Sequence, residues 1–270
     1  MLKVDHLVAG LTLESTGPGR YRAPEVETGH EVIFGGQLLA QSLVAAAADH
    51  EGKRAKTLHT VFARGAAPGT PLDVTVDTMH TGRAFASSTV TISQGDRLCT
   101  RSLVLFTADE PDFIHHADEA PSVGAPPETP ASGGPDEWQV QIVVDVDIPH
   151  PHPPGPPPPA PWAPDDVLTA QAVLAFASDG FLIGTAMRPH AGVGQSQAHI
   201  TLATGVVSHT LTFHEPFPAD DWLLLAHRSP HAGHGRSYGR ADVFTPAGAL
   251  VASYVQDAML RPMPDRSTGG

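Results

Sequence analysis

The chain has 270 residues, of which 41% are hydrophobic and 17% charged, so it can bury a substantial core without disulfides or a structural metal. Its formal net charge of −13 argues against a nucleic-acid partner, because a phosphate backbone needs a concentrated Lys/Arg surface. The single cysteine, Cys99, can form no internal disulfide, which is typical of a reducing compartment. We therefore expect a cytoplasmic globular protein that binds no nucleic acid.

The chain shows no sign of membrane targeting. Its first residues lack the charged and then apolar layout of a signal peptide. We also expect no apolar stretch to reach the roughly 20 residues that a membrane helix requires. The sequence therefore predicts no membrane association.

Two segments have the composition of linkers. Residues 108–136 are rich in Asp, Glu, Pro, Ser and Gly and show no hydrophobic period. Residues 149–159 are mostly proline, which favours polyproline II, either as a stiff surface loop or as a docking site for a proline-binding partner. We expect an N-terminal unit over residues 1–110, a linker over 111–136 and a C-terminal unit over 137–270.

The chain repeats one layout on either side of the first linker. Residues 40–49 and 170–179 are both Ala-rich and almost uncharged until they end in Asp49 and Asp179. Because such a helix has no wide polar face, it should be buried nearly all round. We expect these helices to span about residues 36–50 and 166–187.

A run of strand-like segments with period-two alternation, bounded by Gly and Pro, follows each helix. The first set covers residues 57–64, 72–80, 84–93 and 97–107, and the second covers 199–213, 222–228, 236–244 and 249–260. The third and fourth segments of each set share a spacing, since a Gly-Arg pair (Gly82-Arg83, Gly235-Arg236) precedes a turn glycine by 13 residues in both. Antiparallel hairpins are therefore predicted in both halves.

One apolar helix followed by antiparallel strands is the layout of the hotdog fold, in which a curved sheet wraps around a helix. Two copies predict an α+β double hotdog with two antiparallel sheets, each around a central helix. The two sheets can join edge to edge, which removes an exposed sheet edge. A mixed α/β nucleotide-binding fold would need helices between the strands, and the hairpin spacing leaves no room for them.

Two polar residues break the symmetry of the repeat. Asp49 precedes a plainly polar loop, whereas Asp179 is followed by apolar residues and needs a partner if it is buried. Counting from the Gly-Arg pairs sets Gln256 opposite Leu103, so an amide stands where the other copy has an apolar residue. Since buried polar groups need partners, Asp179 and Gln256 are predicted to share a site.

Four short segments resemble the bacterial acyl-CoA thioesterase II family of double-hotdog enzymes. They are residues 32–37 (VIFGGQ), 177–179 (ASD), 213–217 (FHEPF) and 250–256 (LVASYVQ). They occur in order and at sensible spacing on the predicted repeats, and the similarity covers nearly the whole chain outside the two Pro-rich segments. Each segment alone is short, but the four together are specific.

The resemblance implies hydrolysis of acyl-CoA to free acid and coenzyme A, by an Asp, a Gln and a Thr or Ser that hold one water. The Asp corresponds to Asp179 and the Gln to Gln256. The hydroxyl does not carry over, because Val206 stands at its position. Thr204, Val206 and Ser208 share one face of an alternating strand. We therefore nominate Ser208, with Thr204 or no hydroxyl as the alternatives.

The chemistry asked of these residues is modest, since a thioester has weak resonance stabilisation and a good leaving group. Asp179 would accept the proton of the attacking water, and Gln256 and Ser208 would orient that water. The developing oxyanion needs backbone N–H donors such as those at a helix N-terminus. Gly35, Gly36 and Gln37 are the predicted substrate-binding segment, with a plain glycine turn as the alternative.

No metal or other cofactor is expected. The best histidine clusters are residues 150–152 and the group His227, His231 and His234, and no Cys or carboxylate completes a ligand set at either. The expected partner is the acyl-CoA substrate, and we expect a homo-oligomer. The alternatives are a hotdog hydratase or dehydratase acting on enoyl or hydroxyacyl thioesters, and a non-catalytic hotdog that binds acyl thioesters.

Overall fold

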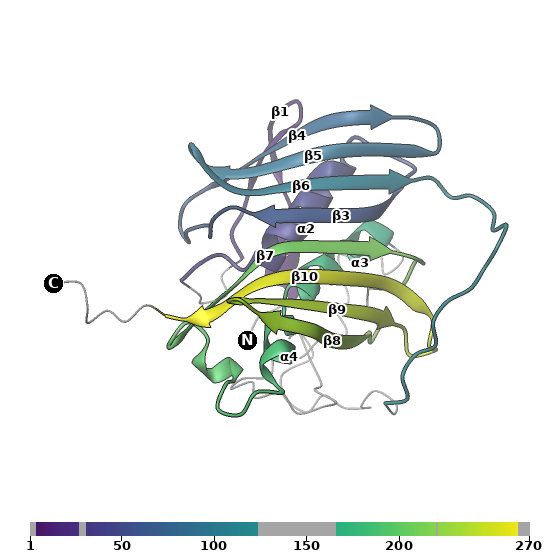
Figure 1. Ribbon diagram of the computed structural model, residues 1–270. Coiled ribbons are helices and arrows are strands. Elements are labelled where there is room, and N and C mark those ends of the chain that lie inside the picture. Colours follow the sequence, from purple (N-terminus) through teal and green to yellow (C-terminus); the bar gives the residue numbers. More distant parts are fainter. Residues whose placement is uncertain (1–3, 27–30, 124–165, 220, 264–270) are drawn as a thin grey trace.

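The computed structural model describes residues 4–26, 31–123, 166–219 and 221–263. In these residues ten strands form one antiparallel sheet in the order β1-β2-β4-β5-β6-β3-β7-β10-β9-β8 (Figure 1). The strands are β1 (Glu14–Gly17), β2 (Arg20–Ala23), β3 (Arg54–Phe62), β4 (Leu72–Thr81), β5 (Phe85–Gln94), β6 (Arg97–Thr107), β7 (Leu202–Phe213), β8 (Leu224–Gly233), β9 (Arg236–Phe244) and β10 (Leu250–Pro262). The predicted antiparallel hairpins are confirmed.

The two predicted sheets are joined into one through β3 and β7. These strands pair over a short register that runs from Thr57 opposite Thr212 to Val61 opposite Ser208. Each of them is therefore an inner strand, with β6 on the far side of β3 and β10 on the far side of β7. The junction covers the two edges that separate sheets would leave unpaired.

The helices lie on one face of this sheet, behind the strands in Figure 1. They are α1 (Val4–Leu11), α2 (Gly35–Ala47), α3 (Val167–Ser178), α4 (Leu182–Met187) and the 3₁₀ turn η1 (Gln195–Gln197). The pair α2 and α3 packs together, α2 mainly beneath β3 and β5, and α3 against β3 and β7. Of the 13 residues of α2, ten are buried, so the prediction of a helix enclosed on nearly all sides is confirmed for that copy.

The second predicted helix, residues 166–187, is not continuous. Asp179 keeps right-handed helical angles as the C-cap of α3, but Phe181 adopts a left-handed φ of 69° and ends the helical path. The chain starts again as α4 at Leu182. A bulky aromatic residue at positive φ is strained, and such strain gathers at functional sites.

The repeat alignment of the fourth strands also needs correction. Leu103 is 48% exposed on the outer face of β6, so it is not the counterpart of buried Gln256. The fourth strands of the two halves are β6 and β10. Each has two adjacent buried residues near its start, which are Cys99 and Thr100 in β6 and Val251 and Ala252 in β10. Aligning these pairs sets Gln256 opposite Val104, which is 1% exposed. The one-residue slip arises because Gly82 lies three residues before β5 whereas Gly235 lies directly before β9, and the longer turn before β10 offsets only part of this difference.

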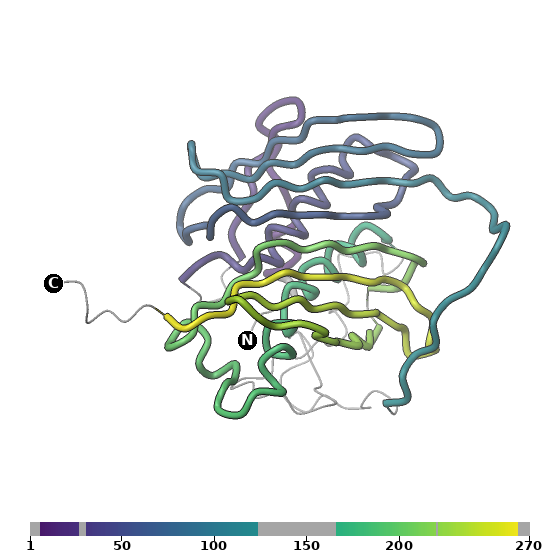
Figure 2. The backbone as a smooth tube through the Cα atoms, in the orientation of Figure 1, coloured from purple at the N-terminus to yellow at the C-terminus, as the bar shows by residue number. Residues whose placement is uncertain are grey.

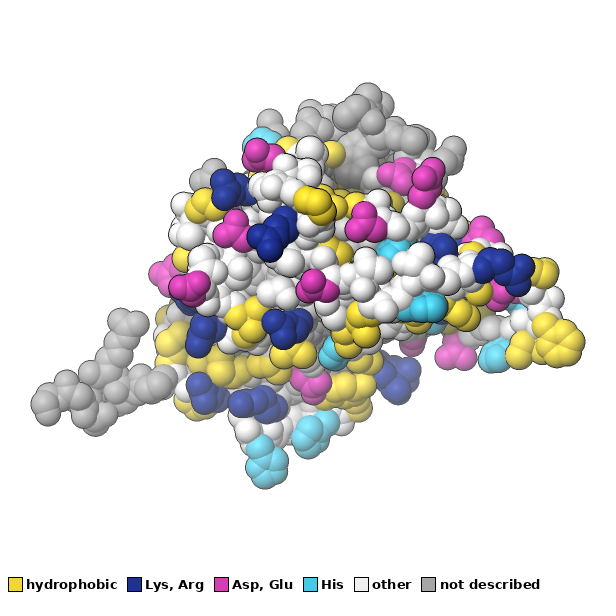
Figure 3. All heavy atoms as spheres, turned by 90° about the horizontal axis from the view of Figure 1, so that it is seen from above, with side chains coloured by type: hydrophobic (Ala, Val, Ile, Leu, Met, Phe, Trp, Pro, Cys, Tyr) yellow, Lys and Arg dark blue, Asp and Glu magenta, His cyan; other side chains and the backbone are white. Residues whose placement is uncertain are grey.

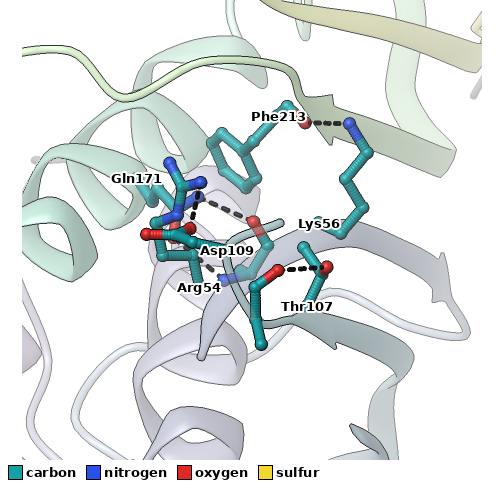
Figure 4. A network of polar contacts seen from close by, with 8 residues as sticks. Arg54, Lys56, Thr107, Asp109, Gln171 and Phe213 are labelled. Atoms are coloured by element: carbon teal, nitrogen blue, oxygen red, sulfur yellow. Dashed lines mark hydrogen bonds and ion pairs between the residues drawn. The ribbon is translucent and has the colours of Figure 1, made fainter. Parts of the chain in front are cut away.

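Polar contacts at the start of β3 also join the two helix-and-strand units (Figure 4). The buried amide of Gln171, on α3, accepts a hydrogen bond from Ala55 N at 3.2 Å and donates one to Ala55 O at 2.8 Å. Nearby, Lys56 Nζ donates to Phe213 O at 2.6 Å, and Arg54 forms an ion pair with Asp109. The Gln171 bonds satisfy backbone groups of β3, and the Lys56 bond satisfies a backbone carbonyl of β7, where the two units meet.

The segment after β6 runs along one side of the sheet from the N-terminal to the C-terminal half, as the teal tube in Figure 2 shows. Residues 108–123 have no regular secondary structure and are mostly exposed. The rest of the predicted linker and the Pro-rich residues 149–159 lie outside the described residues.

One stretch meets the length and composition of a membrane span, contrary to the expectation that none would. It is Val167–Met187, whose most apolar window has a mean hydropathy of 1.5. In this structure the stretch is interrupted between α3 and α4, and half of that window is buried. The core helix of a soluble protein meets the same criteria, so the finding is weak support for a span.

The double hydrogen bond of Gln171 generates a stability prediction. Gln171→Ala should lower the free energy of unfolding by about 2 kcal/mol or more, because it strands a buried N–H and a buried C=O of Ala55. Denaturant unfolding of the full chain measures this, with exposed Asp77→Asn as the control. Equal unfolding midpoints for Gln171→Ala and wild type would contradict it.

Candidate functional site

The side chain of Asp179 lies at the start of the other core helix. Asp179 closes α3, and its carboxyl group accepts a hydrogen bond from the backbone N–H of Gly36, in the first turn of α2. The N-cap residue of α2, Phe34, makes no side-chain capping bond. Asp179 therefore serves α2 as a cap from outside, in a position where the helix dipole favours a negative charge.

The approach of the two helices requires the glycine pair at the start of α2. A Cβ at Gly35 would lie 2.7 Å from Asp179 Oδ2, and one at Gly36 would lie 2.1 Å from Phe176 O. Both distances are too short for a side chain, so any larger residue would push α2 away from α3. The pair is a close-approach site rather than a plain turn.

Burial controls the charge of Asp179. Part of the residue still meets solvent, but protein surrounds its carboxyl group, and this burial raises the pKa of Asp179 from its ordinary 3.8 to about 7. The hydrogen bond from the Gly36 amide opposes the rise. The carboxyl group can therefore exchange a proton near neutral pH, with solvent still in reach.

Gln256 contacts Asp179 directly. Gln256 is 1% exposed on the inner face of β10, and its Nε2 donates to Asp179 O at 3.2 Å and approaches Asp179 Oδ1 at 3.5 Å. The opposite amide orientation would turn Oε1 toward two acceptors, so the observed one is required. Among the described residues Oε1 has no hydrogen-bond partner, which leaves a buried acceptor beside the carboxyl group.

His209 stands next to Gln256 across the strand pair and holds the end of α3. His209 is fully buried, and its Nε2 lies 2.9 Å from Ser178 Oγ, which itself donates to Ala175 O. Since Ser178 donates to the carbonyl, His209 Nε2 is the donor to Ser178. Burial, assisted by His59, lowers the pKa of His209 to about 3, which agrees with a neutral ring.

Tyr254 and His227 complete a buried polar group around the site. Tyr254 lies two residues before Gln256 on the same face of β10, and its Oη is 2.5 Å from His227 Nε2. Burial first, and then the charge of Asp179, raises the pKa of Tyr254 above its ordinary value. Burial lowers the pKa of His227 to about 4. His227 is partly buried and bonded to Tyr254, so it does not form a surface cluster with His231 and His234, which are exposed.

The assignment of Ser208 as the site hydroxyl is wrong. Ser208 Oγ donates to Asp257 Oδ2 at 3.0 Å, in an exposed contact on the outer face. The alternation of β7 is interrupted by a bulge, because Asp257 pairs with Ser208 and the next residue, Ala258, pairs with Val206. A bulge shifts every residue beyond it to the other face of the sheet. Thr204 lies beyond this bulge and is buried on the inner face, with 8% of its surface exposed.

Neither remaining candidate supplies a hydroxyl beside Asp179. Thr204 Oγ1 lies 3.5 Å from His199 Nε2, and Val206 pairs with buried Ala258 and carries no hydroxyl. In the part of the chain that the structure describes, no hydroxyl contacts the side chains of Asp179 or Gln256.

The side chain of Gln37 does not face a ligand. It is fully buried, donates to Pro24 O at 3.0 Å and accepts from Val26 N at 2.9 Å. The side chain of Gln37 therefore anchors the segment before α2, and the predicted part of Gln37 in substrate binding concerns its backbone alone. Of the predicted segment, only the backbone of Gly35 and Gly36 reaches Asp179.

The sister copy lacks the features that define this site. Asp49 is exposed at the end of α2, whereas Asp179 is packed against the other helix. The start of α3 has its own cap, since Asp166 accepts from Leu168 N at 3.1 Å. An aspartate from the other helix is therefore not needed there, and the site exists once.

A Gly-x-Ser-x-Gly pattern at residues 235–239 carries no nucleophile. In serine hydrolases this pattern forms a sharp turn between a strand and a helix. Here Ser237 lies inside β9, where it pairs with Ala232 of β8 and Ala258 of β10. The regular strand geometry excludes an exposed nucleophile elbow at this serine.

Two sequence families match the chain. Residues 23–107 match the acyl-CoA thioesterase N-terminal domain, and residues 103–260 match the acyl-CoA thioesterase C-terminal domain. The two matches together cover strands β3 to β9, nearly all of β10, and the whole of the Asp179 site.

Individual relatives agree with the family matches. The chain is 28% identical over 285 residues to acyl-CoA thioesterase 2 of Haemophilus influenzae, covering 96% of this chain and 98% of that protein. It is 27% identical to acyl-coenzyme A thioesterase 8 of Mus musculus, covering 87% and 82%. Among solved structures, the acyl-CoA thioesterase II TesB2 of Mycobacterium marinum superposes with a TM-score of 0.76 at 27% identity, covering 95% and 97%.

The raised pKa of Asp179 generates a prediction about stability. A carboxyl group whose pKa rises on folding contributes stability at low pH, and this contribution is lost as pH rises through about 7. Asp179→Asn does not titrate, so its stability relative to wild type should grow by up to about 3 kcal/mol between pH 5 and pH 8. Solvent contact would reduce the figure. Denaturant unfolding of both proteins at both pH values measures it, and a constant difference would show that Asp179 keeps its ordinary pKa.

Proposed function

This chain belongs to the acyl-CoA thioesterase family and is a thioester hydrolase, and on that premise we propose that it hydrolyses acyl-coenzyme A with water activated by Asp179 and Gln256. The contact of Gln256 Nε2 with Asp179 at the first turn of α2 is the observation that supports the proposal. It joins a carboxyl group, a buried amide and a helix N-terminus at one point.

In the proposed reaction Asp179 is the general base. The oxygen of a water molecule attacks the thioester carbonyl carbon while the Asp179 carboxylate accepts a proton from that water. The tetrahedral intermediate collapses, the carbon–sulfur bond breaks, and the departing thiolate of coenzyme A takes the proton. A base with a pKa of about 7 suits this exchange, because it is partly ionised at neutral pH and returns its proton readily.

Gln256 is proposed to orient both the base and the water. Its Nε2 fixes Asp179, and its Oε1, which has no partner among the described residues, is the acceptor for the second hydrogen of the water. This second acceptor reduces the need for a hydroxyl, which agrees with Val206 at the position where the family resemblance expects a Thr or Ser. Thr204 has no proposed role in the attack.

The first turn of α2 is proposed to stabilise the oxyanion. The Gly36 amide already donates to Asp179, and the Gln37 amide donates to Phe34 O at 3.1 Å. The Gly35 amide is therefore the proposed donor to the carbonyl oxygen of the substrate. The absence of a Cβ at Gly35 keeps this approach open.

The structural relatives support a hotdog fold, and from it we propose the boundaries of two hotdog units in this chain. We assign residues 1–110 to an N-terminal hotdog, 111–136 to a linker and 137–270 to a C-terminal hotdog, with α2 and α3 as their central helices. Support comes from the packing of α2 beneath β3 and β5 and of α3 against β3 and β7.

We further propose a soluble cytoplasmic homo-oligomer that binds no nucleic acid and no membrane. The relatives that the chain matches are acyl-CoA thioesterases. Support for self-association comes from the outer sheet face, where Val61, Leu103 and Leu105 on β3 and β6 are 49%, 48% and 37% exposed.

Turnover tests the roles of the two site residues. Asp179→Asn and Gln256→Ala should each lower kcat for acyl-CoA at least about tenfold while the fold persists, because each removes a group that activates the water. Thiol release from an acyl-CoA panel measures this. Exposed Asp49→Asn and Ser208→Ala are matched controls that should keep wild-type turnover. Full activity in both site variants would rule out the mechanism.

The pH dependence of turnover is a separate prediction. Because the base must be ionised, kcat/KM should rise about tenfold per pH unit below about 7 and level off above it. An aspartate with an ordinary pKa would give a flat profile over the same range. Initial rates between pH 5.5 and pH 8.5 distinguish the two, and a flat profile would point to another base.

A further inference from the structure

Three arginines converge on one hollow away from Asp179. The hollow has a volume of about 610 Å³ and lies where the end of α4 meets β8 and β9. Its basic lining residues are Arg188, Arg228 and Arg240. On the face seen in Figure 3, by contrast, acidic and basic side chains are interspersed. In a chain with a net charge of −13, such a basic group is a local exception.

Two of these arginines face each other across a strand pair. Arg228 on β8 is the direct partner of Arg240 on β9, so both side chains project from the same face. Like charges opposite each other in a sheet destabilise it unless an anion lies between them. Within the described residues the carboxylate that relieves them is Asp242, 3.9 Å from Arg228, and no ion pair is found for Arg188 or Arg240.

The arginine pair belongs to the C-terminal copy alone. The alignment that sets Gln256 opposite Val104 also sets Arg228 and Arg240 opposite Asp77 and Thr89, which pair with each other in β4 and β5. The repeated architecture therefore does not require two arginines at this position. The pair occurs in the same half as Asp179.

The hollow is poorly suited to a partner strand. Although β8 is the last strand of the sheet, Pro230 lies within it and has no N–H to donate. The pairing with β9 is also interrupted between Arg228 and His231. Edges with a proline and a bulge resist strand addition, which leaves a small anion as the natural occupant.

We propose that Arg188, Arg228 and Arg240 bind the phosphate groups of coenzyme A when the acyl thioester lies at Asp179. This inference rests on the proposed function, because it takes acyl-CoA as the substrate. Guanidinium groups are the preferred protein ligands for phosphate, through paired charge-assisted hydrogen bonds. The site selects the nucleotide end of the substrate, whereas the Asp179 site acts on the thioester.

The chain geometry allows one substrate to reach from Asp179 to Arg188, and Arg228 and Arg240 line the same hollow from the outer face of β8 and β9. Asp179 and Leu182 are three residues apart, and α4 then rises along its axis to Arg188, so their Cα atoms are at most about 20 Å apart. The pantetheine arm has the backbone length of between four and five peptide residues, about 15 Å when extended. The diphosphate and the arginine side chains cover the remainder.

The test compares substrates with and without phosphates. Each of Arg188→Ala, Arg228→Ala and Arg240→Ala should raise KM for octanoyl-CoA about tenfold, the effect of losing one charge-assisted hydrogen bond. None should change kcat/KM for octanoyl-pantetheine, which carries no phosphate and also reports that the fold is intact. Arg101→Ala, on the exposed outer face of β6, is the matched control for lost positive charge.

Binding of adenosine 3′,5′-diphosphate gives a readout that does not depend on turnover. Calorimetry should detect it on wild type and on Asp179→Asn, and the triple arginine variant should lose it. The inference is overturned if the triple variant binds it like wild type, if both substrates respond equally to the arginine changes, or if octanoyl-carrier protein alone responds. If the wild type binds the nucleotide but hydrolyses no thioester, the proposed function is contradicted and the phosphate-site inference still stands.

Discussion

The carboxyl group of Asp179 sits against the uncapped first turn of α2, and most features of the site depend on this contact. It needs two helices from different halves of the chain to approach closely, which the glycine pair at Gly35 and Gly36 permits. It also needs α3 to stop at Asp179, which the left-handed turn at Phe181 achieves. The same contact surrounds the carboxyl group with protein and raises its pKa toward neutrality, at a cost in stability that a catalytic role would explain.

A repeated fold gives this chain two candidate sites, and local differences leave one. Both halves have a buried helix ending in aspartate, but Asp166 caps α3 locally while α2 depends on Asp179. The fourth strands differ in the same sense, with Val104 where the C-terminal copy has Gln256. In the proposed mechanism the N-terminal half contributes backbone amides of α2, and the C-terminal half contributes the side chains of Asp179 and Gln256.

Much of this arrangement was predictable from the sequence because it depends on local periodicity. The two apolar helices and the antiparallel strands follow from patterns of 3.6 and two residues, and Asp179 and Gln256 stood out as polar residues in apolar surroundings. The errors came from irregular backbone. A bulge in β7 turned Ser208 outward, a positive φ at Phe181 divided the second helix, and unequal spacing between the Gly-Arg pairs and the strands that follow them shifted the alignment of Leu103. Such one-residue events leave hydrophobic composition unchanged, so periodicity does not detect them.

His209, the neutral histidine beside Gln256, adds no charge to the site. A protonated His209 would hold Asp179 ionised and lower its basicity, whereas a buried, neutral ring bonded to Ser178 only fixes the end of α3. Tyr254 and His227 likewise satisfy each other without an ion. The positive charges that an anionic substrate requires therefore lie elsewhere, at the end of α4 and on β8 and β9. If the arginines bind phosphate as proposed, separating phosphate recognition from the thioester site would let Asp179 keep a raised pKa while the substrate is still attracted to a strongly acidic protein.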